Sequence, residues 1–146
     1  VEMLREDYLK LLNVFKETDD YVLQTWENDL AYNAPFAKMR DKHSFLEEHG
    51  ADKGYKYKGV FIDILCLEKS PRFLCVLFFI FRWRLLMPIY KKSENKFMGY
   101  LYRITKKLFF SSISVCRFLF GWMPKNKLRH TYGCHWYDKI RISRNS

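Results

Sequence analysis

Apolar and polar residues follow two different periods in the first seventy residues. Across residues 3–16 apolar side chains recur at helical spacing, which predicts an amphipathic helix. Residues 21–25 and 36–42 are short strand candidates, and residues 59–67 give the clearest strand signal in the chain. The segments between these strands are predicted to be loops, so this part of the chain combines a helix with a sheet.

Beyond residue 70 the pattern becomes helical and more apolar. Ser70 and Pro71 suit the N-cap and the first turn of a helix, and residues 73–81 are apolar without a break. This run is shorter than the roughly 20 residues that cross a bilayer. Two arginines follow the run, and Pro88 is expected to limit the helix.

A second helix is predicted over residues 94–120, ended by Gly121 and Pro124. Apolar residues at helical spacing form one stripe along it: Phe97, Leu101, Ile104, Leu108, Val115 and Leu119. Basic residues lie largely off this stripe. Residues 125–146 are basic and aromatic, and their pattern predicts no particular element.

Charge divides the chain at about the same place. Residues 1–70 contain 10 Lys and Arg against 14 Asp and Glu, a net charge of −4, whereas residues 71–146 contain 16 against 2, a net charge of +14. A segment this basic suits phosphate groups on nucleotides, nucleic acid or anionic lipid. Hydrophobic residues make up 49% of the chain, which excludes an intrinsically disordered protein.

The chain has four cysteines: Cys66, Cys75, Cys116 and Cys134. They indicate a reducing compartment, because none belongs to a C-x-x-C pair and three of the four lie in apolar runs. The first residues are interrupted by charges and do not resemble a signal peptide. We therefore expect a cytoplasmic protein. Peripheral contact with the inner face of the plasma membrane is compatible with this location.

One charged residue interrupts the clearest strand. Asp63 lies within the run V-F-I-D-I-L at residues 60–65, and its side chain is expected to share a face of the strand with apolar side chains. An uncompensated charge there is costly. A divalent cation would compensate it, since carboxylates are suitable ligands for Mg²⁺. A salt bridge to Lys38 or Arg40 on a neighbouring strand, or exposure at a strand end, is the alternative.

Three short motifs occur in order along the first seventy residues. Residues 3–8 are M-L-R-E-D-Y, residues 35–41 contain F-A-K-M-R-D, and residues 59–64 are G-V-F-I-D-I. Together they resemble the M-P-R-E-D-Y, F-A-K-I-R-D and G-I-F-I-D-I motifs of the LicD family of phosphorylcholine-type transferases, whose relatives include the fukutin group. The resemblance is close over about residues 1–70 and only general beyond them.

This resemblance implies an α/β (α+β) fold, a partial nucleotidyltransferase-like mixed sheet with flanking helices. Residues 1–70 would belong to the catalytic core, and residues 71–146 would be a helical, basic and aromatic extension of the same domain. The implied reaction transfers phosphocholine or a similar group from a CDP-activated donor to a cell-surface glycan or its lipid-linked precursor, as in lipopolysaccharide biosynthesis. The implied cofactor is Mg²⁺ or Mn²⁺, held by carboxylates of adjacent strands against the donor phosphates.

Two further motifs of the family are not visible in the chain. The acidic run D-D-D-I-D directly precedes the M-P-R-E-D-Y helix, a position that falls before Val1, and residues 132–134 are Y-G-C where the family has Y-G-D. We therefore expect a piece of a metal-dependent phosphotransferase, truncated at its N-terminus and also at its C-terminus, that is inactive alone. Glu68 stands where the family often has Asp, which puts substrate specificity in doubt.

The resemblance also implies roles for three residues. Asp63 matches the aspartate of G-I-F-I-D-I and is expected to be a catalytic carboxylate that holds the metal. Lys38 and Arg40 match the basic positions of F-A-K-I-R-D, and we expect Arg40, with Lys38 beside it, to contact the donor phosphates. The alternative for Arg40 is a structural ion pair with Asp63 or Asp41.

The basic half of the chain allows two interpretations. It could dock on an anionic membrane through its basic residues and its Phe- and Trp-rich helices. Its apolar stripes could instead be core packed on the catalytic sheet, with a basic face in solvent. The alternative function is accordingly a non-catalytic, basic module that binds membrane surfaces. Nucleic acid is not an expected partner, because no binding motif accompanies the charge.

Overall fold

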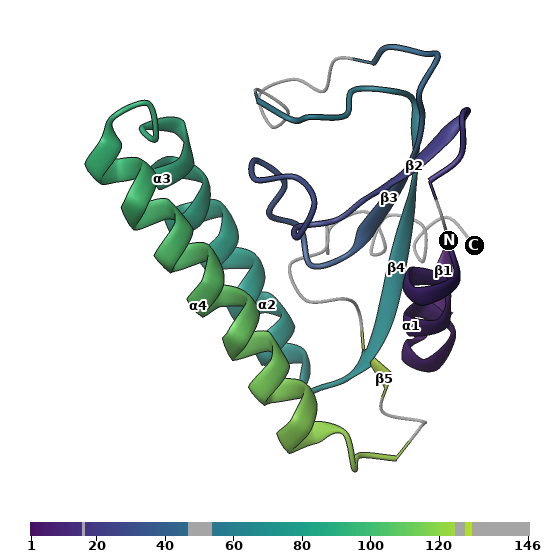
Figure 1. Ribbon diagram of the computed structural model, residues 1–146. Coiled ribbons are helices and arrows are strands. Elements are labelled where there is room, and N and C mark those ends of the chain that lie inside the picture. The colour runs from purple at the N-terminus through teal and green to yellow at the C-terminus, as the bar shows by residue number, and fades with distance from the viewer. Residues whose placement is uncertain (16, 47–53, 125–127, 130–146) are drawn as a thin grey trace, which may run out of the picture. The chain divides into compact units, whose positions relative to one another are not determined.

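The computed structural model describes residues 1–15, 17–46, 54–124 and 128–129. The chain divides into two compact units, Val1–Leu67 and Glu68–Ser146, which are described separately below. Figure 1 shows a mixed sheet with helices, in agreement with the predicted α+β class.

The first unit is built on a mixed sheet with the strand order β1-β4-β3-β2. Its strands are β1 (Glu2–Leu4), β2 (Tyr21–Gln24), β3 (Ala37–Asp41) and β4 (Phe61–Lys69), whose last two residues belong to the second unit. Strands β2, β3 and β4 are antiparallel neighbours, whereas β1 runs parallel to β4. The predicted strands at residues 21–25, 36–42 and 59–67 correspond to β2, β3 and β4 within one or two residues at each end.

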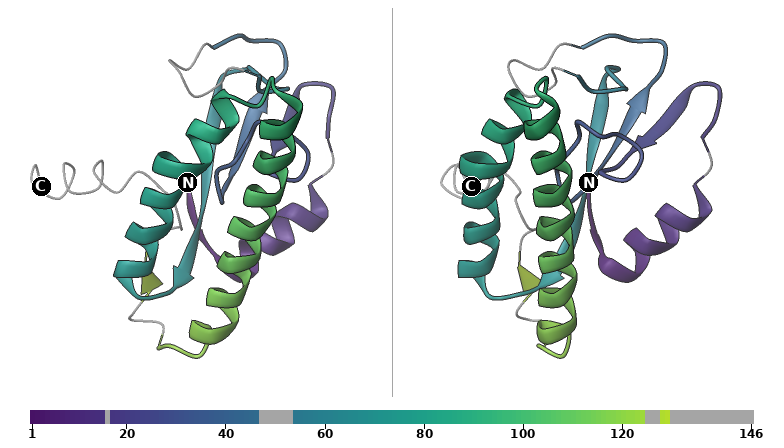
Figure 2. Two further views of the ribbon diagram at one scale, coloured as in Figure 1. Left: turned by 90° about the vertical axis from the view of Figure 1, so that its left-hand side faces the viewer. Right: turned by 60° about the vertical axis from the view of Figure 1, so that its left-hand side comes forward.

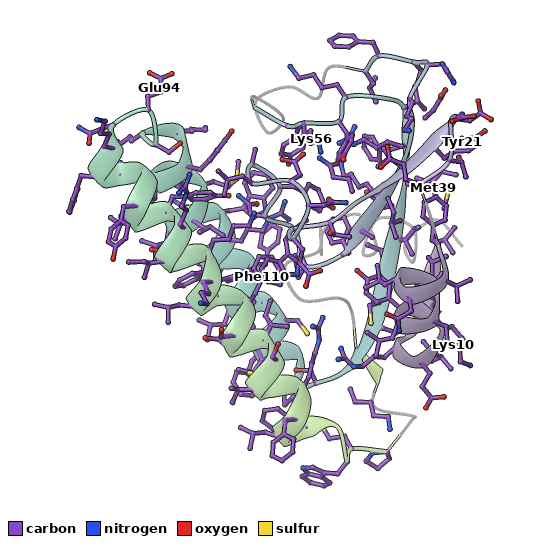
Figure 3. The ribbon with its side chains drawn as sticks, viewed as in Figure 1. Lys10, Tyr21, Met39, Lys56, Glu94 and Phe110 are labelled. Atoms are coloured by element: carbon purple, nitrogen blue, oxygen red, sulfur yellow. The ribbon has the colours of Figure 1, made fainter. Side chains whose placement is uncertain are left out.

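Helix α1 (Arg5–Val14) packs on one face of this sheet. Alternate strand residues turn their side chains to that face, because successive side chains of a strand point to opposite sides. The buried residues that form this core are Tyr8, Leu23, Ala37, Ile64 and Cys66, with Met3, Leu11, Leu12, Phe15 and Met39 packed around them. In Figure 3, Lys10 extends from the outer side of α1, consistent with an amphipathic helix.

The start of α1 differs from the sequence prediction. Residues 3 and 4 were expected to be helical, but they pair with β4, where Met3 lies opposite Cys66. The backbone N–H of Leu65 also donates to the carbonyl of Val1, 2.8 Å away. Helical periodicity could not reveal this pairing, since a hydrogen-bonded ladder with a strand sixty residues later has no local signature.

The second unit is mainly helical. It contains α2 (Arg72–Phe81), the π-helical turn η1 (Arg82–Leu86), α3 (Met87–Lys91) and α4 (Lys96–Phe120), and β5 (Leu128–Arg129) pairs with the end of β4. In both views of Figure 2, α4 lies beside the continuous helix formed by α2, η1 and α3. Phe109 of α4 packs against Phe78 and stacks on Phe81, with ring centroids 5.6 Å apart in both pairs.

The first helix of this unit is longer than predicted. It continues through the two arginines and past Pro88, because the π-helical turn comes before the proline and places it in the first turn of α3, where its missing N–H is tolerated. The predicted N-cap is also wrong, since Pro71 occupies that position and Ser70 does not cap the helix. The resulting stretch Phe73–Lys91 is long and apolar enough to cross a membrane, although 28% of its most apolar window is buried.

Helix α4 begins after Asn95, whose side chain accepts a hydrogen bond from the N–H of Phe97, 2.9 Å away. Gly121 follows the helix, as predicted. The buried side consists of Tyr102, Lys106, Phe109, Phe110 and Ile113. The stripe predicted from periodicity lies on the opposite, solvent-facing side: Phe97, Ile104, Leu108, Val115 and Leu119 are exposed. Leu101, the sixth predicted member, is half-buried. The exposure of the other five members does not fit the interpretation of this stripe as core.

Three of the four cysteines lie among the described residues, and none of these three forms a disulfide. Cys66 and Cys75 are buried, as expected of core residues, while Cys116 is only partly buried. Burial nevertheless raises the pKa of the Cys116 thiol above its ordinary value. Cys134 lies outside the described residues.

Gly59 precedes β4 at a point where two backbone segments meet. A Cβ atom at this position would lie 1.6 Å from the carbonyl oxygen of Asp41, so the substitution Gly59→Ala forces the strands apart. We expect it to lower the free energy of unfolding by about 3 kcal/mol, the upper range for overpacking. Urea unfolding followed by circular dichroism measures this loss. The neighbouring half-exposed Val60 gives the control Val60→Ala, and an unchanged midpoint for Gly59→Ala would refute the close approach.

Candidate functional site

The face of the sheet opposite α1 carries polar and charged side chains. Lys38 lies opposite Asp63 and Arg40 lies opposite Phe61, so the strand register places all three predicted site residues on one face. Gln24 lies opposite Lys38 on the other neighbour of β3 and joins the same face. The two faces of the sheet therefore differ: one packs in the apolar core with α1, and the other carries the polar and charged side chains of these residues.

Asp63 and Lys38 form a cross-strand ion pair. The Nζ atom of Lys38 is 3.8 Å from Oδ1 of Asp63 and 3.5 Å from the ring centre of Phe61. The Lys38 side chain is 8% exposed, but that of Asp63 is 41% exposed. Asp63 is therefore less embedded in apolar surroundings than the sequence predicted, and the proposed structural alternative of a salt bridge with Lys38 is present. Oδ1 itself is buried, so solvent reaches the Asp63 side chain through its other atoms.

Arg40 is the centre of a buried hydrogen-bond network. It is 1% exposed, its Nε donates to Oε1 of Gln24 at 2.5 Å, and one Nη donates to the carbonyl of Gly59 at 2.8 Å. The guanidinium also lies over the Phe61 ring, 4.7 Å from its centre. These contacts give Arg40 a structural role that links β2, β3 and the segment before β4. Its contact with donor phosphates stays a prediction.

Asp29 extends this network and was not identified from the sequence. It is buried, and its Oδ2 accepts hydrogen bonds from Nε2 of Gln24 at 2.6 Å and from the backbone N–H of Lys56 at 2.8 Å. Its Oδ1 accepts from the N–H of Ala31, a turn contact that Asp often makes two residues ahead. Only this local turn preference was visible in the sequence. The long-range partners at residues 24 and 56 were not.

A hollow of about 240 Å³ lies beside the network. Its lining includes four basic residues, Arg40, Lys42, Lys56 and Lys58, and one acidic residue, Asp41, together with Ser44 and Tyr57. Such a concentration of positive charge favours an anionic ligand. A hydrogen bond with Tyr57 raises the pKa of Lys56 above its ordinary value.

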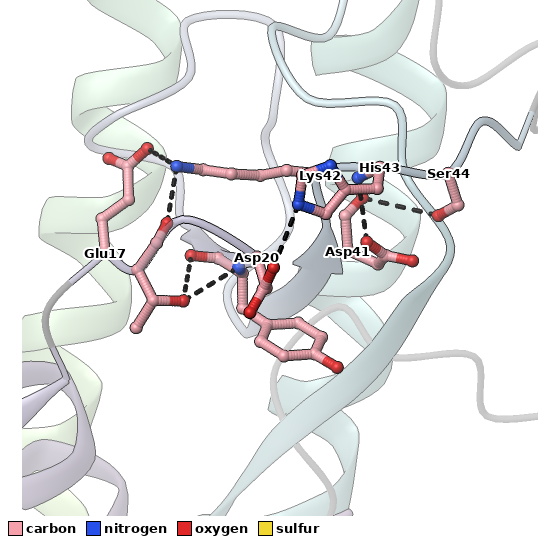
Figure 4. Close-up of polar contacts among 8 residues, drawn as sticks. Glu17, Asp20, Asp41, Lys42, His43 and Ser44 are labelled. Carbon is pink, nitrogen blue, oxygen red and sulfur yellow. Dashed lines mark hydrogen bonds and ion pairs between the residues drawn. The ribbon is translucent and has the colours of Figure 1, made fainter.

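Lys42 is held in place by groups at the end of β3 (Figure 4). Its Nζ lies 2.7 Å from Oε1 of Glu17 and donates to the carbonyl of Thr18, also at 2.7 Å. The hydrogen bond from Lys42 lowers the pKa of Glu17 below its ordinary value. Beside it, Nε2 of His43 lies 3.0 Å from Oδ1 of Asp20. Because Lys42 already has these partners, Lys56 and Lys58 are the more available cations of the hollow.

The described residues do not form a complete divalent-metal site. No group of three or more His, Cys, Asp or Glu side chains comes together in the described part of the chain. Asp63 contributes a single carboxylate with an ammonium beside it, whereas Mg²⁺ prefers several oxygen ligands. His130, Cys134 and His135, whose spacing does not match a standard zinc-binding pattern, lie outside the described residues.

Comparison with known proteins adds no relative: no protein-family model, curated protein or solved structure matches the chain. The arrangement on the polar face therefore has to be interpreted from its own geometry.

Proposed function

We propose that the chain is part of a LicD-type phosphotransferase, in which Asp63 supplies one of several metal-binding carboxylates. The reaction would transfer phosphocholine or a similar phospho-substituent from a CDP-activated donor to a cell-surface glycan or its lipid-linked precursor. The observation that carries this proposal is the parallel pairing of β1 with β4 directly beside Asp63.

The register of this pairing fixes what a longer β1 would bring to the site. Glu2 lies opposite Leu65, and the amino group of Val1 donates to the carbonyl of Asp63 at 2.7 Å. If the strand continues backwards, the residue before Val1 lies opposite Asp63, and the residue two positions earlier lies opposite Phe61. Paired residues of neighbouring strands project to the same face. Both positions would therefore join Asp63 on the polar face.

The family's D-D-D-I-D run stands directly before the M-P-R-E-D-Y helix, and it has acidic residues at alternate positions. In a chain that carries such a run before Val1, two of its carboxylates would be placed beside Asp63. Together these groups would provide the oxygen ligands that Mg²⁺ or Mn²⁺ requires, which Asp63 alone does not. A bound cation would neutralise charge on the donor phosphates. Lys38 and the basic hollow supply further positive charge on the protein side.

Binding of CDP, the part common to the donors, tests the proposal most directly. The 146-residue chain is compared with a chain extended by the acidic residues that its gene encodes before Val1, using isothermal titration calorimetry. We expect the extended chain to bind CDP in the presence of Mg²⁺ and to lose binding in EDTA, and the 146-residue chain not to bind. The extended chain should also release CMP from CDP-choline when a glycan acceptor is added.

Two results would contradict the proposal. One is turnover or Mg²⁺-dependent CDP binding by the 146-residue chain alone, since it lacks the additional carboxylates. The other is a gene whose residues before Val1 contain no acidic run, because no ligand set could then form around Asp63.

A further inference from the structure

Helix α4 carries an exposed apolar stripe from Phe97 to Phe118, broken by Ser111, on the side away from the buried residues. One of those buried residues, Phe110, is labelled in Figure 3. Every member is at least 40% exposed, and Phe118 reaches 85%: Phe97, Tyr100, Ile104, Leu108, Val115 and Phe118. The members follow one another at intervals of three, four or seven residues, so they lie on one face of the helix. The helix is thus apolar on two opposite sides, only one of which is buried.

A row of basic residues borders this stripe. Lys96, Arg103 and Lys107 each stand one position before a stripe residue, and all three are exposed. One residue turns a helix by about 100°. The three cations therefore lie on the same flank of the stripe rather than being scattered around the helix. The helix Lys96–Phe120 contains no Asp or Glu that would offset them.

The exposed apolar stripe and its basic border together indicate one kind of contact surface. A solvated helix normally exposes its polar face, and an exposed apolar stripe of this length marks a contact surface. An apolar stripe rich in aromatic residues, with Lys and Arg along its border, is the pattern of a helix that lies in the plane of a bilayer surface. The apolar side chains enter the acyl boundary, while the long basic side chains reach anionic headgroups.

We propose that the exposed stripe of α4 and its basic flank form a docking surface for an anionic lipid bilayer. The helix lies parallel to the membrane plane, with Phe97 and Phe118 near its two ends inserted below the headgroups. Charge complementarity identifies the partner, because an uncharged apolar protein groove would leave the basic row without counter-charges. The surface requires neither a CDP-activated donor nor a divalent cation, so this inference stands apart from the proposed enzymatic activity.

Vesicle flotation of the 146-residue chain tests this docking in the presence of EDTA. The vesicles contain phosphatidylcholine alone or three parts phosphatidylcholine to one part phosphatidylglycerol. We expect binding to the anionic vesicles at 50 mM NaCl and release at 500 mM NaCl, where charges are screened over on the order of 4 Å. Binding that is equal for neutral and anionic vesicles, or that resists 500 mM NaCl, overturns a surface held by charge.

Two variants separate the parts of the surface. The triple variant Lys96→Gln, Arg103→Gln, Lys107→Gln should weaken binding about 100-fold, from the loss of three cations near an anionic surface. The double variant Leu108→Gln, Phe118→Gln should weaken it by at least about 10-fold through lost apolar insertion. Because these side chains are exposed, circular dichroism should show an unchanged fold.

A matched control removes the same charge elsewhere. The variant Lys10→Gln, Arg84→Gln, Lys91→Gln changes exposed cations that lie outside α4 and outside the basic hollow, and it should bind vesicles like the unchanged chain. Equal weakening by both triple variants would show that net charge, not this surface, drives binding. The other candidate partner for the stripe is a second copy of the chain, which sedimentation without lipid tests. The proposal is overturned if the chain is a dimer, if Leu108→Gln, Phe118→Gln converts it to a monomer, and if this variant still binds vesicles.

Discussion

If the proposed phosphotransferase function holds, replacement of Asp63 by Asn in the chain extended before Val1 should reduce its kcat by about 1000-fold, the scale seen when a charge-stabilising group is removed from an active site. The amide keeps the shape of the side chain but loses the negative charge that a cation needs. The fold should persist, because the Asp63 side chain is 41% exposed and does not belong to the apolar core of the sheet. Since its partner Lys38 is only 8% exposed, circular dichroism should confirm that the variant is folded before its kcat is compared. Steady-state kinetics at saturating Mg²⁺ measure the loss.

Two companion variants give this result its meaning. Asp20→Asn removes a more exposed carboxylate of the same unit, which pairs with His43 away from the polar face, and should leave kcat unchanged. Lys38→Met removes the ion-pair partner of Asp63, while the carboxylate of Asp63 keeps its negative charge. If Asp63 serves only to hold Lys38, both variants of the pair should lose activity equally and with the same dependence on Mg²⁺ concentration. Retention of activity by Asp63→Asn within about tenfold would exclude the metal role.

Substitution of Arg40 by Met should lower the free energy of unfolding by about 3–5 kcal/mol, the range for breaking a buried charged network. The change would leave Oε1 of Gln24 and the carbonyl of Gly59 without the donors that now satisfy them. Gln24 links the buried carboxylate of Asp29 to the Arg40 guanidinium through two hydrogen bonds. The substitution would therefore also remove the positive charge at the other end of this link from Asp29. Urea unfolding monitored by circular dichroism, with soluble yield as a second measure, reports the loss.

Arg103→Met is the control for this substitution, because it makes the same chemical change on the exposed side of α4. It should shift the unfolding midpoint very little, as surface substitutions do. If Arg40→Met unfolds like the unchanged protein but abolishes CDP binding by the complete enzyme, Arg40 acts on the donor phosphates and the structural interpretation is wrong. Loss of stability without loss of CDP binding, measured under conditions where the variant is folded, would support the structural interpretation alone.

The sheet could be predicted because its strands carry local signals. The run at residues 60–65 is β-branched and aromatic, and it falls within β4 except for its first residue. The strand register, by contrast, depends on pairings between distant residues. This register places Lys38 and Arg40 on the same face as Asp63. From the sequence, the three residues were connected only through the family resemblance of their motifs. The buried partners Gln24 and Asp29 could not be predicted, since polar residues at a strand end or in a loop are usually solvated.

The helical unit shows a different limit of sequence reasoning. The periodic stripe of α4 was found correctly, but periodicity states only that a face is apolar and not whether that face is buried. The opposite side, with Phe109 and Ile113, is the buried one. Similarly, Pro88 indicated a helix end, and only the π-helical turn Arg82–Leu86 explains how the helix continues past it.

The amino group of Val1 occupies a rung of the β1–β4 ladder through its bond to the carbonyl of Asp63. Peptide fused ahead of it in the laboratory would enter the sheet at that rung, and its last residue would share a face with Asp63. An affinity tag at this end thus changes the chemical surroundings of the carboxylate under test. The 146-residue chain should therefore be assayed with no foreign residue before Val1, and the extended chain with any tag placed ahead of its own residues at these positions.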